Sequence, residues 1–255
     1  MAELSSLNSY FNKVYVITLE RSIERHEKMQ TMLQGLEFSF FYGNDKKELT
    51  MDELLEQGIY DEQKAISLHK DDKPLNTTQI SCAWSHRLVY EDMIANNYER
   101  VLILEDDVII KKEGLALFED MVEQLPEDWE LWYLDYHKNL RRDLGTFLVQ
   151  QFLHFRRWIN KLKWNHTMIN NMYARKYKTN IFIAGSHQFS TAYAITHEGA
   201  KKLIELQTPI AFCSENLLSY ACANAIVEGY VSVPKLFLRE SYLQDKKNKE
   251  TYVAE

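Results

Sequence analysis

The most constraining feature of the chain is residues 100–104, RVLIL, followed at once by Glu105, Asp106 and Asp107. A short apolar run of this kind is typical of a strand buried in a sheet. In open α/β sheets, ligands bind beyond the carboxyl ends of the strands. Three adjacent acids repel one another unless a cation or solvent relieves them, and oxygen ligands suit Mg²⁺ or Mn²⁺. The segment therefore predicts a cation site, with a solvated acidic turn as the alternative.

Other strand-length apolar runs alternate with segments of helical spacing. Strands are expected at 13–19, 38–43, 131–134, 191–195 and 230–233. Helices are expected at 22–35, 81–96 and around 117–125, after the strand at 191–195 through Leu203 and Ile204, and after Ser214. Ser22 and Ser214 are predicted helix caps. This alternation indicates an α/β sheet with helices on both faces. Since no Gly/Ser-rich linker or internal repeat divides the chain, we expect a single domain over residues 1–255.

A basic segment at residues 138–178 interrupts an acidic chain. It holds ten Lys and Arg and one acid, Asp143, a net +9 that leaves −16 elsewhere in a chain whose total is −7. An apolar stripe at helical spacing predicts an amphipathic helical insertion; it comprises Leu148, Phe152, Phe155, Ile159 and Leu162. Arg156, Arg157, Lys161 and Lys163 lie off this stripe. The segment indicates either an anionic partner or a helix whose aromatics pack inward and whose charges are solvated.

Several classes of protein are excluded by what the sequence lacks. No apolar run approaches the ~18 residues of a membrane span. The three cysteines, Cys82, Cys213 and Cys222, show no CxxC spacing, which argues against a structural zinc site or a disulfide framework. The glycine-rich phosphate motifs GxxxxGK[ST] and GxGxxG are also absent.

Some isolated residues have both a structural and a functional interpretation. Arg21 and Arg25 follow the first predicted strand at a helix N-terminus, where an anion could bind, or they are surface residues. His86 is either a structural histidine or part of a site. Glu215, in the first turn after Ser214, can complement a helix dipole.

Four segments, in order, resemble the blocks of glycosyltransferase family 25. They are VYVITLERSIERHEKM, QISCAWSHRLVYEDMIANNYERVLILEDDV, WELWYLD and STAYAITHEGAKKLIE. The resemblance spans residues 14 to about 240, and its second block is the most specific. Two positions depart from the family pattern: Ser81 stands where Gly is usual, and Glu215 stands where the family commonly has Asp.

The resemblance implies a GT-A-like, Rossmann-related single domain with a mixed, mostly parallel sheet, a nucleotide-sugar donor and inversion at the anomeric carbon. By position, the residues that would surround the donor are Ile17, Thr18, Leu19, Arg21, Arg25, Ser81, Cys82, Ala83, His86, Glu105 and Asp106. Asp107 and Glu105 would bind the divalent metal, Mn²⁺ or Mg²⁺. A carboxylate base is needed for the acceptor hydroxyl. Glu215 is our candidate for it and Asp135 is the reserve.

The family includes bacterial lipopolysaccharide and lipooligosaccharide sugar transferases and animal collagen galactosyltransferases. We therefore expect transfer of a hexose, with galactose favoured, from a UDP-sugar to a lipopolysaccharide or lipooligosaccharide core. Arg156, Arg157, Lys161 and Lys163 would serve the anionic acceptor or membrane. The start of the sequence shows no signal-peptide layout, and the ending TYVAE is no endoplasmic-reticulum retention tail. Both favour the cytoplasmic face of the bacterial inner membrane.

Three alternatives stay open. The acceptor could be a capsule glycan or a protein side chain. The chain could be a catalytically inert partner that binds nucleotide sugars. Binding of nucleic acid through residues 138–178 is disfavoured, because the −16 charge on the rest of the chain would repel phosphates.

Overall fold

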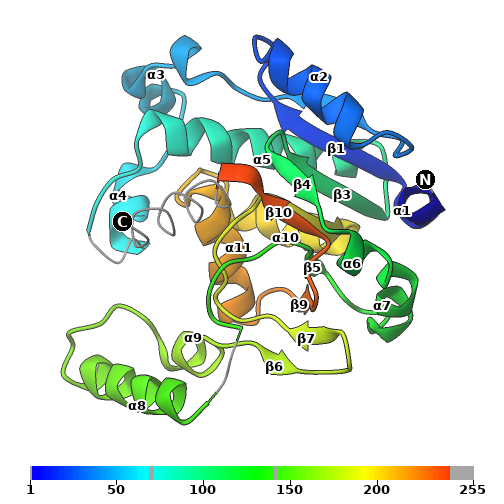
Figure 1. The fold of residues 1–255 in the computed structure, drawn as a ribbon. Coiled ribbons are helices and arrows are strands. Elements are labelled where there is room, and N and C mark those ends of the chain that lie inside the picture. The colour runs from blue at the N-terminus through cyan, green and yellow to red at the C-terminus, as the bar shows by residue number, and fades with distance from the viewer. Residues whose placement is uncertain (1, 69–71, 141–142, 242–255) are drawn as a thin grey trace, which may run out of the picture.

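A computed structural model describes residues 2–68, 72–140 and 143–241 (Figure 1). Its centre is an eight-stranded sheet in the order β2-β1-β3-β8-β5-β9-β7-β6. These strands are β1 (Lys13–Thr18), β2 (Ser39–Tyr42), β3 (Arg100–Glu105), β5 (Leu131–Tyr133), β6 (Arg175–Lys176), β7 (Ile181–Ile183), β8 (Ala192–Thr196) and β9 (Gly229–Ser232). A separate two-stranded ribbon joins β4 (Val108–Ile110) to β10 (Phe237–Arg239).

The sheet is mixed, and most of its strands share one direction. β2, β1 and β3 are mutually parallel, and β8 runs antiparallel between β3 and β5. β9 is parallel to β5, whereas β7 is antiparallel to both β9 and β6. Of the described strands in this sheet, only β7 and β8 therefore run against the others. The expected α/β class with a mixed, mostly parallel sheet is confirmed.

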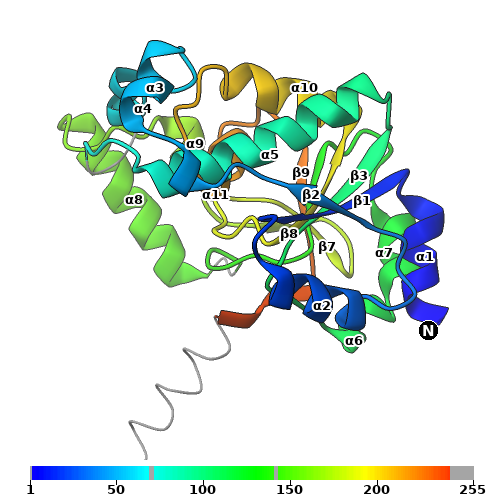
Figure 2. The ribbon, with the colours of Figure 1, turned by 90° about the horizontal axis from the view of Figure 1, so that it is seen from above.

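Helices cover both faces of the sheet (Figure 2). One face packs on α5 (Thr77–Ala95), α10 (His197–Leu206) and α11 (Ser214–Ala223). The other packs on α1 (Ala2–Tyr10), α2 (Ile23–Met32), α6 (Lys112–Leu115) and α7 (Phe118–Gln124). The remaining helices are η1 (Lys46–Glu48), α3 (Met51–Glu56), α4 (Glu62–Leu68), α8 (Leu144–Trp158) and α9 (His166–Asn170). Within the described part of the chain, no helix is both long and apolar enough to cross a membrane.

Strand β3 shows why an unbroken apolar run was needed at its position. Val101 and Ile103 belong to the core on the α5 face, whereas Leu102 and Leu104 belong to the core on the α2 face. All four side chains are fully buried. Since successive side chains of a strand point to opposite faces, a strand covered on both sides must be apolar at every position. The expected buried strand at 100–104 is confirmed.

Two helix boundaries differ from expectation. The helix expected at 81–96 begins four residues earlier, because Asn76 and Gln79 form a reciprocal capping box at its N-terminus. Cys213, and not Ser214, occupies the cap position of α11. The predicted role of Ser214 as a cap is therefore wrong. Its hydroxyl instead lies 3.0 Å from the hydroxyl of Ser190. Ser22 does precede α2, but its side chain makes no capping hydrogen bond.

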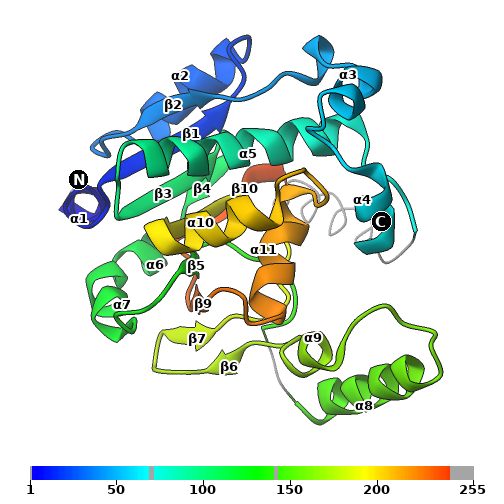
Figure 3. The same ribbon diagram turned by 180° about the vertical axis from the view of Figure 1, so that it is seen from behind.

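The basic segment forms α8 and α9 and then enters β6 at the edge of the sheet (Figures 1 and 3). The predicted helix is present but ends at Trp158, before Ile159 and Leu162 of the predicted stripe. Asp143 caps it by accepting a hydrogen bond from the backbone of Thr146 at 2.8 Å. The idea that its aromatic residues pack inward is wrong, because Phe152 and Phe155 are both exposed. Arg141 and Arg142 lie outside the described residues.

Candidate active site

The site begins where β3 ends. Because β8 is antiparallel to β3, the residues that lead into β8 lie beside the carboxyl end of β3. The backbone N–H of Glu105 donates to the carbonyl of Thr191 at 2.8 Å, and the Ser190 hydroxyl donates to the Glu105 carboxylate at 2.7 Å. Ser190 in turn contacts Ser214 at the start of α11. The topology therefore brings β3, the loop before β8 and α11 to one point.

Glu105 faces a buried histidine of α5. His86 Nε2 lies 3.6 Å from Glu105 Oε1, and His86 Nδ1 lies 2.8 Å from the Tyr193 hydroxyl. Burial lowers the pKa of His86, but Cys82 and Glu105 outweigh it and raise this pKa to about 9. Burial likewise raises the pKa of Glu105, but contact with His86 leaves it below its usual value. The pair is therefore charged at neutral pH. His86 thus lies within ion-pair distance of Glu105.

The two aspartates after Glu105 point to different partners. Asp106 accepts a hydrogen bond from the Thr18 hydroxyl at 2.6 Å and forms an ion pair with Arg25. It therefore ties the end of β1 and the start of α2 to this loop. Asp107 instead accepts from Arg239 Nε at 3.2 Å, and its buried Oδ1 has no hydrogen-bond partner. Burial, followed by the charge of Glu105, raises the pKa of Asp107.

Arg239 is the site residue that sequence reasoning missed. It lies on β10, and its position in the ribbon is opposite Val108, the residue after Asp107. Its guanidinium interacts electrostatically with Glu105, Asp107 and Glu215, which raise its pKa against the effect of burial. Its local sequence, LFLRES, carries no signal, because only the pairing of β10 with β4 brings it to the acids.

Glu215 lies in the first turn of α11. Its Oε2 accepts a hydrogen bond from the backbone N–H of Phe189 at 3.2 Å. It also lines a cavity of about 490 Å³ between α11 and the basic segment, with Lys138, Trp164 and Gln188 on other walls. The site thus places a carboxylate at the boundary between the acid cluster and a space large enough for a sugar.

Asp135, the reserve base, lies in a different environment. It follows β5, is buried, and pairs with Lys235 at 3.0 Å. Burial raises the pKa of Asp135, and the ammonium of Lys235 opposes that rise. Lys235 also donates to the carbonyl of Tyr136 and lies over its ring. Asp135 is therefore part of an ion pair that joins β5 to the segment before β10.

This ion pair gives a pH-dependent prediction. Lys235→Met leaves the buried carboxylate of Asp135 without its cation. Loss of one partner of a buried pair costs about 3–5 kcal/mol. Because the Lys235 side chain is 24% exposed, we expect about 2 kcal/mol less unfolding free energy at neutral pH.

The loss of unfolding free energy caused by Lys235→Met should become smaller as the pH falls. In the variant the folded-state pKa of Asp135 rises further above its unfolded value, so the native state binds the proton more tightly. Its unfolding free energy therefore increases as pH falls through that pKa. Urea unfolding of both proteins between about pH 7 and about pH 5 checks this. A difference that stays constant or widens toward low pH contradicts the assignment.

Two of the predicted donor residues near β1, Leu19 and Arg21, line a second cavity of about 450 Å³ together with Gly43. The rim is held by α5: the Ser85 hydroxyl accepts a hydrogen bond from the N–H of Asn44 at 2.9 Å, and Ser81 donates to the Asn44 carbonyl. The second sequence block, on α5, therefore holds the loop after β2. That loop borders the cavity that Leu19 and Arg21 of the first block also line.

The other predicted residues fall into three groups. Ile17 and Ala83 pack in the core on the α5 face. Cys82 offers its sulfur to a cluster with His86 and Glu105, in which the three ligand atoms lie within 4.8 Å of one another. The four cations lie on or after α8, away from β3 in Figures 1 and 3; these are Arg156, Arg157, Lys161 and Lys163.

The acid cluster fits a divalent cation. Asp107 has a buried oxygen without a partner, and a second carboxylate, Glu105, is close enough to raise its pKa. Carboxylate oxygens are the ligands that Mg²⁺ and Mn²⁺ favour. Asp106 fits this role less well, because Thr18 and Arg25 already occupy both of its oxygens.

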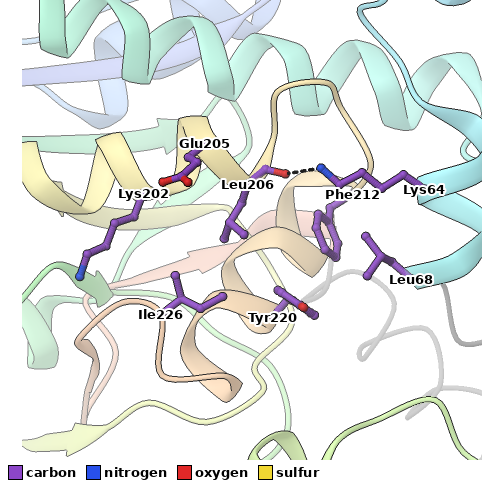
Figure 4. A pocket seen from close by; sticks show the side chains of 8 residues that line it. All are labelled: Lys64, Leu68, Lys202, Glu205, Leu206, Phe212, Tyr220 and Ile226. Atoms are coloured by element: carbon purple, nitrogen blue, oxygen red, sulfur yellow. Dashed lines mark hydrogen bonds between the residues drawn. The ribbon is translucent and has the colours of Figure 1, made fainter.

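A further cavity, of about 370 Å³, lies between α4, α10 and α11 (Figure 4). Phe212 and Tyr220 line both this cavity and the one beside Glu215. Lys64 and Lys202 also line it, and Lys64 donates to the Leu206 carbonyl at 3.5 Å. Its only lining carboxylate among the described residues is Glu205, so we assign it no part in the chemistry.

Comparison with known proteins identifies the family of this chain. The model of glycosyltransferase family 25 (LPS biosynthesis protein) matches residues 11–218. The chain therefore belongs to glycosyltransferase family 25. The match includes β3, the acids that follow it and Glu215, but it ends before Arg239. The mixed α/β sheet is consistent with the GT-A-like fold that the resemblance implies.

Three relatives of known name are animal proteins. A glycosyltransferase 25 family member of Aedes aegypti is 29% identical over 201 residues, 75% of this chain and 28% of that protein. Procollagen galactosyltransferase 2 of Homo sapiens is 29% identical over 132 residues, 49% of this chain and 20% of that protein. Inactive glycosyltransferase 25 family member 3 of Homo sapiens is 25% identical over 207 residues, 77% of this chain and 29% of that protein. The chain thus matches less than a third of these relatives' length.

A solved structure, that of apo mouse xyloside xylosyltransferase 1, gives a TM-score of 0.34 at 16% identity, covering 85% of this chain and 64% of that one.

Proposed function

We propose that the protein transfers a hexose, galactose in first place, from a UDP-sugar to a hydroxyl of a lipopolysaccharide or lipooligosaccharide core, with inversion. The observation that carries the proposal is the position of Arg239 among Glu105, Asp107 and Glu215 in a member of family 25. An acid pair that can hold a cation and a separate carboxylate beside a sugar-sized cavity are the parts that such a transfer requires.

The reaction needs one proton transfer and one displacement. The acceptor oxygen forms a bond to the anomeric carbon, while the bond from that carbon to the diphosphate oxygen breaks and UDP leaves with the electron pair. The acceptor proton passes to the carboxylate of Glu215. Attack opposite the leaving group inverts the anomeric carbon. The Phe189 N–H fixes one oxygen of Glu215, so the base is oriented before the acceptor binds.

Asp107 and Glu105 would hold a divalent ion, Mn²⁺ or Mg²⁺, which stabilises the developing charge on the diphosphate. Arg239 adds a fixed positive charge beside the same acids. On the other side, Arg21 and the loop held by Ser81 border the cavity that suits the nucleotide.

The acceptor would occupy the cavity beside Glu215. Trp164 offers an aromatic face to a sugar ring, and Lys138 offers a cation to the phosphate or carboxylate groups of a lipopolysaccharide core. Lys138 also begins the segment that carries +9, which favours an anionic acceptor over a neutral one. We place the reaction at the cytoplasmic face of the bacterial inner membrane, where such an acceptor is lipid-bound.

Two other functions have support of their own. The relatives named procollagen galactosyltransferases favour a protein acceptor. The match to a protein named inactive covers 77% of this chain and favours a catalytically inert partner that binds a nucleotide sugar.

An acceptor assay separates these functions. UDP-galactose and Mn²⁺ are supplied with a deacylated lipopolysaccharide core, with a neutral capsule oligosaccharide, or with a procollagen peptide, and products are read by mass spectrometry. We expect a hexose added to the lipopolysaccharide core alone. Transfer only to the peptide or to the capsule glycan would overturn the acceptor assignment. Donor binding without transfer to any acceptor would favour the inert partner.

A further inference from the structure

Helix α8 has its apolar face turned away from the protein. Leu148 is 60% exposed, Phe152 59% and Trp158 77%. Leu144 and Phe155 are exposed on the same side, since they lie three, four or seven residues from these positions along the helix. Phe147 is exposed there too, three residues after Leu144. A helix on the surface of a globular protein normally buries such a stripe, and monomers seldom expose a contiguous patch of this kind.

The opposite face of α8 is polar and holds the helix in place. Gln150 is buried and donates to the Ile169 carbonyl at 2.6 Å and to the Asn170 carbonyl at 3.2 Å. His154 lies 3.0 Å from the side-chain oxygen of Asn170 and 2.9 Å from His166. These contacts bind α8 to α9, and α9 packs on α11. The outward direction of the apolar side chains is therefore fixed by hydrogen bonds to the rest of the chain.

Positive charge borders the exposed face. Arg156 lies in the last turn of α8, Lys161 follows it, and both are exposed. Arg157 is half-buried, and Lys163 instead pairs with Asp72. If a second copy of the chain docked on this face through the same segment, two segments of net charge +9 would meet and repel each other. An anionic lipid surface instead complements this charge. Aromatic and aliphatic side chains on one face with cations at its border are typical of helices that lie in a membrane interface.

We infer that α8 inserts its exposed apolar face into the interfacial region of a membrane that contains anionic lipid. This inference deepens the proposed function. It rests on that function only for the statement that the acceptor cavity faces the membrane. The cavity beside Glu215 is lined by Lys138 and Trp164, which flank α8 along the chain, and by Met168 of α9. Docking of α8 would therefore bring the acceptor cavity close to a lipid-bound glycan.

Cosedimentation with vesicles tests this. Wild-type protein should bind vesicles of phosphatidylglycerol and phosphatidylcholine in equal parts, bind phosphatidylcholine alone far more weakly, and lose affinity as salt rises. The double variant Phe152→Glu/Phe155→Glu should bind at least about a hundredfold more weakly, since each buried Phe contributes about tenfold. Leu55→Glu on α3, at a side chain 39% exposed, is the matched control and should bind as wild type.

A second readout separates insertion from adsorption by charge alone. Trp158 fluorescence should be quenched by brominated lipid in the anionic vesicles, and Trp158→Phe should remove most of this quenching without loss of the fold, as judged by circular dichroism. The inference fails if wild type does not bind the vesicles, if the double variant binds equally well, or if Trp158 is not quenched. It also fails if the double variant instead abolishes a lipid-independent dimer.

Failure of this inference is distinguishable from failure of the proposed function. Release of sugar from the donor in lipid-free solution does not involve α8, so the double variant should keep it. Donor turnover without vesicle binding removes the inference and leaves the function, whereas vesicle binding without donor turnover does the reverse.

Discussion

Asp107→Asn is expected to reduce transfer by about a thousandfold and to weaken its dependence on Mn²⁺. Asp107 has a buried oxygen without a partner, and it lies beside Glu105 and Arg239. The amide keeps the shape of the side chain but removes the negative charge that a divalent ion needs. The rate of hexose transfer as a function of Mn²⁺ concentration checks this, together with the affinity for UDP with and without metal.

Asp106→Asn is the matched control, since it is the same change at the neighbouring residue. Asp106 is tied to Thr18 and Arg25, so its variant should lose stability more than metal dependence. Asp107→Asn should leave the unfolding free energy equal or higher, because burial and Glu105 already disfavour the charged form of Asp107. A variant of Asp106 that loses metal dependence while Asp107→Asn keeps it would reverse our assignment of the ligand.

Glu215→Gln is expected to reduce transfer by about a hundred- to ten-thousandfold while donor affinity stays within about twofold of wild type. The amide oxygen can still accept the hydrogen bond from Phe189, so the loop before β8 should keep its position. Only the capacity to take a proton is lost. Single-turnover transfer and equilibrium binding of UDP-galactose measure the two effects separately.

Glu215→Asp is the conservative control, because it keeps a carboxylate in the position where the resemblance expects Asp. It should retain far more activity than the amide. If Glu215→Gln turned over at the wild-type rate with donor bound, the base would have to be another group. In that case Asp135→Asn would be the next variant to measure, although its pairing with Lys235 makes a loss of stability the expected result.

The sheet could be predicted because its signals are local. In the segment 100–104, every side chain that is buried in the sheet core is apolar. A strand covered on both faces requires this composition. The antiparallel insertion of β8 between β3 and β5 could not be predicted, since the alternation of strands and helices does not give strand order. That insertion places Ser190 beside Glu105 and so determines half of the site.

The sequence predicts the site residues that a single segment of the chain supplies. It does not predict which residues distant segments bring together. Glu105 and Asp107 follow directly from their position after a strand. Asp106 and Asp107 have different roles because they have different partners. Thr18, Arg25 and Arg239 approach these aspartates only in the folded chain. The stripe on α8 was correctly recognised as amphipathic, but periodicity cannot say which face is covered. Hydrogen bonds of Gln150 and His154 decide that its polar face is the inner one.

We expect this member of family 25 to be a metal-dependent transferase that uses a nucleotide sugar. The most direct measurement is release of free sugar from a panel of UDP-, GDP- and CMP-sugars without acceptor, in Mn²⁺ and in EDTA. Our account predicts slow release from a UDP-hexose, UDP-galactose in first place, in Mn²⁺ and none in EDTA. Absence of release together with absence of binding to every donor would contradict it.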